Sequence, residues 1–443
     1  MSKILGIIIG LLILSLMLFL HELGHFLIGR ALGFKVVEFS IFMGPRLLTW
    51  ERNGINYSLK LIPLGASVEF AGEYSEDDVK EEKTEADIKQ ARAEGNFFAM
   101  PIWKRALTML AGPLMNLITA SLAFIILFSI TSFRTTKIAN VSNDSLAEAA
   151  GVSAGERVVE LADYDVNTDL DMTIASLLMN QTEPYSLKTI DADGNTQSYT
   201  IKPEKTITYK LGITMNFADG NISIAQTNTD INPDANKFVL GDQIKKVNGK
   251  SITPEEISAG ALSDINSEPI KFTVLRGDDL VDLEVTPAAI EVPKTLGLEL
   301  KVNEDGSKIL PYSFAYQWSY VKGTAKVIGQ IFTGSMKASD SLTGPVGIVD
   351  TFNKVVTSKQ LTIGPKLLSL LSLFATISLA LGATNLLPIP PLDGGQLFLL
   401  LIEKIRGKRL SIKAENIITI LGILFVLLLF VVALTADIGR IFR

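Results

Sequence analysis

The chain has 443 residues, of which 47% are hydrophobic and 20% charged, with two histidines and no cysteine. The missing cysteine excludes disulfide frameworks, iron–sulfur clusters, cysteine-ligated zinc and thiol nucleophiles, and a net charge of −6 gives no support to nucleic-acid binding. A mean hydropathy of +0.32 is too apolar for an ordinary soluble enzyme and indicates a membrane protein.

Four apolar stretches are long enough, or nearly so, to cross a bilayer, which takes roughly 20 helical residues. They are residues 4–28, 106–130, 367–392 and 417–434. The first lacks the small-residue cleavage site of a secretory signal, so we expect it to be retained. Lysine and arginine gather between the third and fourth stretches and at the start of the second, which predicts that these places face the cytoplasm. Both termini and residues 131–360 are then expected on the outer side.

The chain between the first two stretches predicts strands. Residues 55–61 alternate apolar and polar side chains, which is the period of a half-buried strand, and a turn at 63–65 lets the chain return. A second pair of strands is predicted at 36–42 and 47–51. Residues 73–94 hold nine acids and four bases without Gly or Pro, so we expect a solvated helix or linker to which we assign no chemistry.

The outer segment contains an internal repeat. Gly155-Glu156-Arg157-Val158 resembles Gly241-Asp242-Gln243-Ile244, and a Glu-Pro pair and a strand-ending proline recur at matching distances after each glycine. Two copies of one strand–turn–helix–strand–strand unit explain this spacing. The unit resembles a PDZ domain, which binds a peptide by adding it as a strand to an exposed sheet edge. Plain spacer domains with closed grooves are the alternative.

The first apolar stretch carries the sequence His21-Glu22-Leu23-Gly24-His25, an H-E-x-x-H motif. In a helix, positions i and i+4 lie on nearly one face, so two imidazoles can hold one metal ion while Glu22 takes a proton from its water. Ionisable residues inside a membrane helix are costly and therefore indicate function. The alternative is a hydrogen-bonded polar cluster between helices.

A catalytic zinc needs a third protein ligand, and with no histidine or cysteine left this ligand should be a carboxylate. Asp393 ends the third stretch, after three prolines that break the helix, and broken backbone at membrane depth is tolerated only where it is buried in protein or lines a cavity. Alternatively, Asp393 only turns the chain out of the membrane. Asn385 could donate to an oxyanion or hold a substrate backbone, or could join two helices. For Asn116 we expect a packing role.

Three motifs together resemble a known family. H-E-L-G-H, A-G-P-x-x-N and N-x-x-P-x-P-x-L-D-G, in this order, are similar to those of the site-2 proteases, which are intramembrane zinc metalloproteases, and with two PDZ-like repeats the chain most resembles the bacterial regulator-of-sigma-E protease group. The resemblance implies a Zn²⁺ ion held by His21, His25 and Asp393, with Glu22 as general base. It also implies that residues 54–72 form a re-entrant hairpin whose edge receives an unwound substrate.

Two positions depart from the pattern of many relatives and leave substrate preference open. Gln396 stands where His or Arg is usual, and Met100 precedes Pro101 where Lys is common.

The expected fold is therefore an α-helical membrane protein with four transmembrane helices, a re-entrant β-hairpin region and two extracytoplasmic PDZ-like α+β domains. The expected divisions are 1–34 (first helix), 35–100 (hairpin region and acidic linker), 101–133 (second helix), 137–205 and 208–295 (PDZ-like domains), 310–360 (outer helical segment), 361–395 (third helix) and 415–436 (fourth helix).

The expected function is zinc-dependent hydrolysis of peptide bonds within transmembrane segments, as in regulated intramembrane proteolysis. The substrates would be single-pass proteins of the anti-sigma-factor type or signal-peptide remnants, in a bacterial cytoplasmic (inner) membrane, with the PDZ pair as a gate. Its partners are then these substrates and the lipid bilayer, with no nucleic acid. The alternatives are a PDZ-bearing membrane scaffold or chaperone with a structural metal, and a metal transporter, for which the second and fourth stretches lack paired carboxylates.

Overall fold

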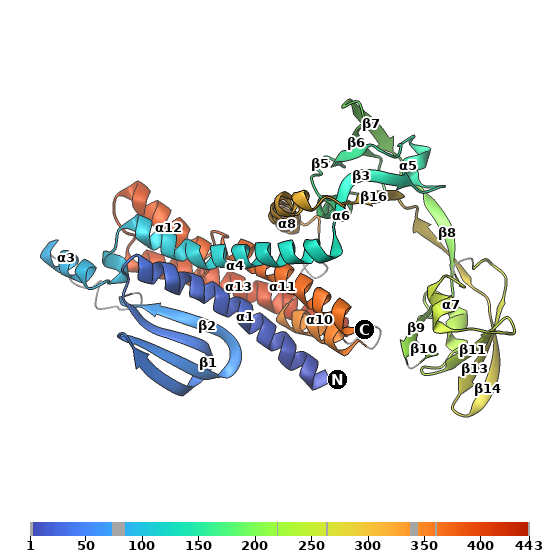
Figure 1. Ribbon diagram of the computed structural model, residues 1–443, viewed down its shortest axis with the longest axis horizontal. Coiled ribbons are helices and arrows are strands. Elements are labelled where there is room, and N and C mark those ends of the chain that lie inside the picture. Colours follow the sequence, from blue (N-terminus) through green and yellow to red (C-terminus); the bar gives the residue numbers. More distant parts are fainter. Residues whose placement is uncertain are drawn as a thin grey trace. The chain divides into compact units, whose positions relative to one another are not determined.

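The computed structural model describes residues 3–72, 85–218, 220–262, 265–336, 344–358 and 361–441 (Figure 1). The chain divides into two compact units. The helical unit comprises residues 1–133 and 303–443, and the repeat unit comprises residues 134–302. Most of the acidic segment at 73–94 and part of the predicted helical segment at 310–360 lie outside the described residues.

Long apolar helices form the helical unit, and four of them are long and apolar enough to cross a membrane, which confirms the four predicted spans. The helices of this unit are α1 (Lys3–Ala31), α3 (Glu85–Ala93), η1 (Phe97–Ala99), α4 (Ile102–Thr131), α8 (Ile309–Phe332), α10 (Pro345–Thr357), α11 (Ile363–Asn385), α12 (Asp393–Arg406) and α13 (Ile412–Ile441). The candidate spans lie in α1, α4, α11 and α13. The third span ends at Asn385 rather than at residue 392, because the prolines that follow offer no N–H to continue a helix.

Helix α10 is held between the first and last helices of the chain. Gly6 of α1 lies so close that a Cβ there would be 2.2 Å from Oδ1 of Asn353 in α10. At the start of α10, the carboxylate of Asp437 in α13 accepts backbone N–H bonds from Gly344 (3.1 Å) and Gly347 (2.7 Å). Asp437 therefore satisfies amides that the first turn of a helix leaves unpaired.

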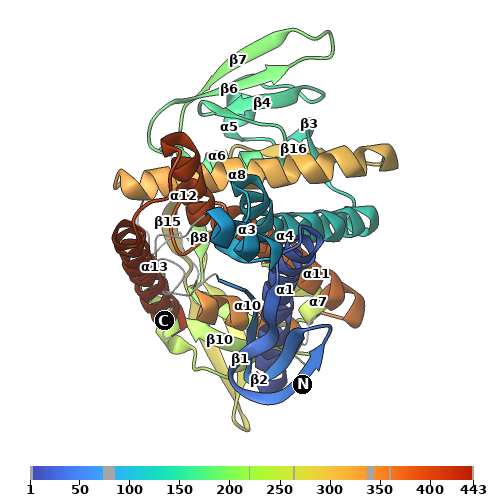
Figure 2. The ribbon, with the colours of Figure 1, turned by 90° about the vertical axis from the view of Figure 1, so that its left-hand side faces the viewer.

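Two long bent strands, β1 (Val36–Arg52) and β2 (Ile55–Phe70), make a sheet that packs against α1 (Figures 1 and 2). Residues 36–41 pair with 66–70 on one side and with 56–59 on the other, while 46–52 pairs with 55–60. The predicted pairing of 36–42 with 47–51 is therefore wrong. The hairpin expected within residues 54–72 is wrong as well, because 66–70 pairs with 36–41 and not with 55–61.

The reason is the turn at Asn53 and Gly54, whose φ angles of +55° and +72° suit a two-residue hairpin connection. This turn makes 46–52 return along 55–60, so residues 36–41 find their partners elsewhere. Among the described residues, the segment 66–70 has one strand partner and is an edge of the sheet.

The repeat unit contains two sheets and a connecting two-stranded ribbon. The first sheet has the order β16-β3-β4-β6-β7, the second β14-β13-β11-β10-β9, and the ribbon pairs β8 with β15. The elements are β3 (Arg134–Val141), α5 (Leu146–Ala149), β4 (Arg157–Leu161), β5 (Tyr164–Asp165), α6 (Asp169–Leu178), β6 (Tyr185–Ile190), β7 (Thr196–Ile201), β8 (Lys205–Lys210), β9 (Ile213–Ala218), β10 (Asn221–Thr227), η2 (Pro233–Lys237), β11 (Gln243–Val247), β12 (Lys250–Ser251), α7 (Pro254–Ser258), β13 (Ile270–Arg276), β14 (Asp279–Val285), β15 (Ala288–Pro293) and β16 (Leu298–Val302), and η3 (Gly306–Lys308) follows them in the helical unit. Each sheet has its own apolar core.

The internal repeat has a structural counterpart in matched hydrogen bonds. The N–H of Gly155 donates to Ile138, and the N–H of Gly241 donates to Ile224, both at 2.9 Å. The acid after each glycine accepts a backbone N–H from three residues earlier, Glu156 at 3.2 Å and Asp242 at 2.9 Å. The two copies differ in extent, because β16 joins the first sheet from beyond 137–205.

Candidate metal centre

His21, His25 and Asp393 converge within the helical unit, as the sequence predicts. Nε2 of His21 lies 3.2 Å from Nε2 of His25, and the Asp393 carboxylate lies 3.0 Å from the former and 3.4 Å from the latter. In a tetrahedral zinc site with bonds of about 2.0–2.1 Å, the ligand atoms lie about 3.3–3.4 Å apart. The spacing of these three donors therefore fits a zinc ion.

Asp393 reaches this place because the chain turns tightly between α11 and α12. The first residue of α12 is Asp393, and glycines follow it at 394 and 395. A Cβ on Gly394 would lie 2.2 Å from the carbonyl oxygen of Leu386, and one on Gly395 would lie 2.3 Å from the nitrogen of Pro390. Side chains at these two positions would push α12 away from the preceding turn, so the glycines allow Asp393 to sit at the site.

His25 is oriented by α4. Its Nδ1 lies 2.7 Å from the carbonyl oxygen of Thr108, which can only accept, so Nδ1 carries the proton and the lone pair of Nε2 faces Asp393. A Cβ on Gly112 would lie 2.2 Å from Nε2 of His25. The imidazole of His25 therefore occupies the space that a side chain would fill at Gly112, the glycine of the A-G-P-x-x-N motif.

Asn116 orients the other imidazole, although the sequence predicted a packing role for it. Its side-chain Nδ2 lies 3.3 Å from Nδ1 of His21, while its buried Oδ1 has no hydrogen-bond partner within the described part of the chain. Turning the amide by 180° places Oδ1 at His21 and lets Nδ1–H donate to it. That arrangement gives Oδ1 a partner and leaves Nε2 of His21 free to bind metal.

Glu22 connects the site to the sheet. Its carboxylate accepts a 3.1 Å hydrogen bond from the backbone N–H of Val68, in the edge segment 66–70. The two histidines are buried and Glu22 is half-buried. The H-E-x-x-H turn of α1 thus presents its imidazoles to α4 and α12 and its carboxylate to the sheet edge.

Asn385 is the last residue of α11 and is half-buried. Its side chain makes no hydrogen bond to any residue in the described ranges. Its predicted contact with substrate stays a prediction.

An ion pair that sequence reasoning missed joins α4 to α12. Arg105 contacts Glu403 through two hydrogen bonds of 3.0 and 2.6 Å, and the arginine is buried. From the sequence, Arg105 is only one of the positive charges at the start of the second apolar stretch. The two residues lie almost 300 positions apart in the sequence, so no local sequence pattern predicts their contact.

Comparisons with known proteins agree with this geometry. A family model described as "Peptidase family M50" matches residues 9–429. "Protease RseP" of Yersinia pestis is 27% identical over 462 residues, which cover 97% of each chain. "Regulator of sigma-W protease RasP" of Bacillus subtilis (strain 168) is 25% identical over 98% of this chain and 99% of that protein. "Zinc metalloprotease RasP" of Shouchella clausii (strain KSM-K16) is 25% identical over 97% of this chain and 98% of that protein.

A solved HtrA3 PDZ domain bound to a phage-derived ligand matches 20% of this chain and 92% of its own, at 20% identity. The TM-score of 0.17 does not establish a shared fold.

The family match spans nearly the whole chain, including the H-E-x-x-H helix and Asp393. It confirms the predicted resemblance and, with it, the predicted class of enzyme and its zinc dependence. The chain belongs to peptidase family M50.

Proposed function

We propose that this peptidase is an intramembrane zinc endopeptidase that cuts transmembrane segments of single-pass membrane proteins in regulated intramembrane proteolysis. The observation that carries the proposal is the convergence of three metal donors at 3.0–3.4 Å inside a bundle of membrane-spanning helices. A scaffold with a structural metal would have no need for Glu22 beside the donors.

Nε2 of His21, Nε2 of His25 and the carboxylate of Asp393 would hold the metal. A zinc ion bound there supplies Lewis-acid polarisation of the scissile carbonyl and a lowered pKa for a water molecule. Thr108 and Asn116 hold the two imidazoles in the tautomers that leave both Nε2 atoms free.

Glu22 acts as general base. It accepts the proton of the attacking water and later passes it to the leaving amine. The N–H of Val68 fixes one carboxylate oxygen and leaves the other to receive the proton. Asn385, at the end of α11, donates from its amide to the substrate backbone or the developing oxyanion; a helix-to-helix hydrogen bond is the competing role.

The substrate must unwind before it can react, because a helix keeps its carbonyls in i to i+4 bonds. Strand pairing with the edge segment 66–70 replaces the lost hydrogen bonds. Since Val68 in this edge bonds to Glu22, a strand added there comes within reach of the base.

We infer a bacterial cytoplasmic membrane as the location, with the loop between α12 and α13 facing the cytoplasm. That loop is rich in lysine and arginine, and the positive-inside rule supports this orientation. The repeat unit then lies outside as two PDZ-like domains, 137–205 and 208–295, that restrict access to already shortened substrates. The matched hydrogen bonds at Gly155 and Gly241 support one unit built twice. The name of the Bacillus subtilis relative, "Regulator of sigma-W protease RasP", supports a substrate of the anti-sigma-factor type.

The test is cleavage of a model single-pass substrate by purified protein. We expect Glu22→Gln and chelator treatment each to abolish cleavage, while Glu51→Gln, an exposed acid of the same sheet, leaves it intact. Glu22→Gln should retain bound zinc and Asp393→Asn should lower it. Cleavage that persists both in Glu22→Gln and under chelation would contradict the protease, and unchanged zinc in Asp393→Asn would move the third ligand elsewhere.

A further inference from the structure

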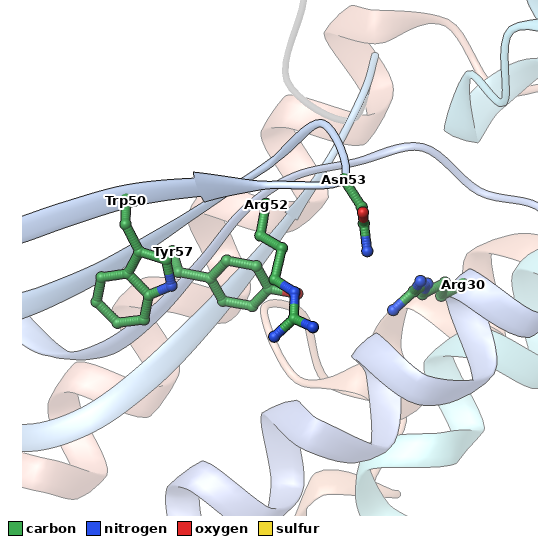
Figure 3. A pocket seen from close by; sticks show the side chains of 5 residues that line it. All are labelled: Arg30, Trp50, Arg52, Asn53 and Tyr57. Carbon is green, nitrogen blue, oxygen red and sulfur yellow. The ribbon is translucent and has the colours of Figure 1, made fainter.

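A cavity of about 490 Å³ lies at the far end of α1 from the N-terminus, beside the tip of the β1–β2 hairpin. It is lined by Arg30, Trp50, Arg52, Asn53 and Tyr57. Arg30 comes from the last turn of α1, and the other four come from the hairpin. Figure 3 shows Arg30 and Asn53 pointing toward the same space, with Arg52 reaching beside it from the strand.

The lining has two positive charges and no acid. Within the described ranges, neither Arg30 nor Arg52 takes part in an ion pair or hydrogen bond. Two guanidinium groups that have no ion-pair partner among the described residues, beside an amide, form a site whose chemistry suits an anion. Planar guanidinium groups match the oxygens of a phosphate in pairs.

Exposed apolar side chains lead to the cavity from both elements. On α1, Leu27 and Ile28 are exposed immediately before Arg30, and on β1, Leu47 and Leu48 are exposed before Trp50. Trp50 stacks on Tyr57, with ring centroids 5.8 Å apart and planes 13° apart. An apolar surface that ends in Trp, Tyr and Arg is typical of the boundary between acyl chains and headgroups.

The cavity lies at the same end of the helical unit as the basic loop after α12. Nζ of Lys104, in the first turn of α4, donates to the carbonyl oxygen of Leu32 at 2.8 Å, which joins the start of α4 to the end of α1. The pair Arg105–Glu403 joins the same part of α4 to the end of α12. In the proposed orientation this end faces the cytoplasmic leaflet, where anionic lipids gather.

We propose that the cavity binds the phosphate of an anionic phospholipid headgroup. Arg30 and Arg52 contact the phosphate oxygens, the Asn53 amide supplies a further donor, and the stacked rings of Trp50 and Tyr57 cover the glycerol and the first acyl carbons. A soluble phosphate offers the same oxygens but has no chain to cover the exposed apolar surface. A bound headgroup joins the end of α1 to the hairpin tip, and so steadies the sheet that carries Val68. The proposal depends on the proposed membrane orientation and not on cleavage.

Trp50 provides the measurement. Of the three tryptophans, Trp103 and Trp318 are replaced by Phe, so that Trp50 remains as the reporter. The full chain is placed in phosphatidylcholine nanodiscs containing brominated phosphatidylglycerol or, for comparison, brominated phosphatidylcholine. We expect quenching of Trp50 to favour the anionic lipid, and Arg30→Gln and Arg52→Gln each to lower that preference about fivefold. Arg406→Gln removes an exposed charge at the same end that does not line the cavity, so it should lower the preference reported by Trp50 less than either cavity variant does. Each variant is first shown to elute as a single species.

Two further arms decide between a built site and general surface charge. Arg52→Lys keeps the charge but loses the planar fork, so it should lose most of the preference. Wild-type behaviour of Arg52→Lys, or an equal loss in Arg406→Gln, would overturn the proposal. So would inorganic phosphate that alters Trp50 fluorescence in phosphatidylcholine discs and removes the lipid preference, because the site would then take a soluble anion.

Discussion

The short sequence motifs of the two units differ in the contacts that they make: those of the helical unit contact distant parts of the sequence, and those of the repeat unit contact their own sheet. In the helical unit, the candidate metal centre joins α1, α4 and α12, and the contacts of His25 with Thr108 and of His21 with Asp393 join residues far apart in the sequence. In the repeat unit, the glycine–acid motif closes a turn onto a neighbouring strand of its own sheet. A small change in the helical unit should therefore remove function, whereas a similar change in a repeat should cost only local stability. The following variants test this contrast, beginning with the largest expected effect.

Gly112→Ala should inactivate the enzyme. The new Cβ would lie 2.2 Å from Nε2 of His25, so the imidazole must move away from its position beside Asp393. Misplacement of a catalytic group by about 1 Å costs on the order of 100-fold in rate. Cleavage rate and bound zinc are the measurements. Gly439→Ala in α13, where a Cβ meets nothing within 4 Å, is the matched control. Full activity of Gly112→Ala would mean that His25 does not need this close approach.

Asn116→Ala should weaken zinc binding about 10- to 100-fold, which is the usual effect of losing a residue that orients a metal ligand. The structure adds a finer expectation, because the role assigned to Asn116 is to accept the Nδ1 proton of His21. Asn116→Asp keeps an acceptor and should retain more affinity than Asn116→Ala. Competition with a chelator measures both. Equal affinities of the two variants would show that the amide only fills space.

Glu403→Gln should have a moderate effect. It leaves the buried Arg105 without its countercharge, which loosens α12 and with it Asp393, at a cost of about 2 kcal/mol to the helical unit. We expect faster zinc release to a chelator and a lower thermal midpoint. Glu415→Gln breaks the more exposed pair with Arg409 and should change zinc release little. The same rate of zinc release in both variants would show that the Arg105–Glu403 pair does not help to hold Asp393 at the metal site.

Asp242→Asn should leave cleavage rates unchanged and destabilise the second sheet. Hydrogen bonds from Arg276 lower the pKa of the Asp242 carboxyl. In the unfolded state the pKa of an aspartate is about 3.9. Because the pKa of Asp242 in the folded state lies below this value, the unfolded state binds the proton more tightly. The contribution, about 1.5–3 kcal/mol for a hydrogen bond to a charged group, is therefore present above the unfolded pKa and lost as the pH falls through the folded pKa.

Hydrogen exchange of β11 and β13 in the full-length protein measures this effect. In the wild type, protection of these amides should decrease as the pH is lowered. In Asp242→Asn, protection should be lower at neutral pH and should change less with pH. The exposed turn variant Asp278→Asn should follow the wild type. A drop in cleavage in Asp242→Asn would instead show that the two units act together.

The same contrast explains what the sequence could reveal. The length of the apolar stretches identifies the four spans, and helix geometry explains why His21 and His25 share one face. Since no other histidine and no cysteine is present, a carboxylate such as Asp393 is expected as the third ligand. The dipeptide Asn53-Gly54 is typical of a two-residue hairpin turn and pairs 46–52 with 55–60, so the predicted pairing of 36–42 with 47–51 is wrong. The contact of Asn116 with His21 and the pair Arg105–Glu403 depend on how separate helices pack, which no local pattern encodes.

The split of the metal donors between α1 and α12 also sets an order in time. During synthesis His21 and His25 enter the membrane early, but Asp393 follows about 370 residues later. At about 5–20 residues per second, the ribosome needs between about 20 and 70 s to reach it. Throughout this interval the growing chain holds two of the three proposed donors, so with this donor set we expect cleavage only once the fold is nearly finished. The distance along the chain between the proposed donors thus acts as a built-in delay.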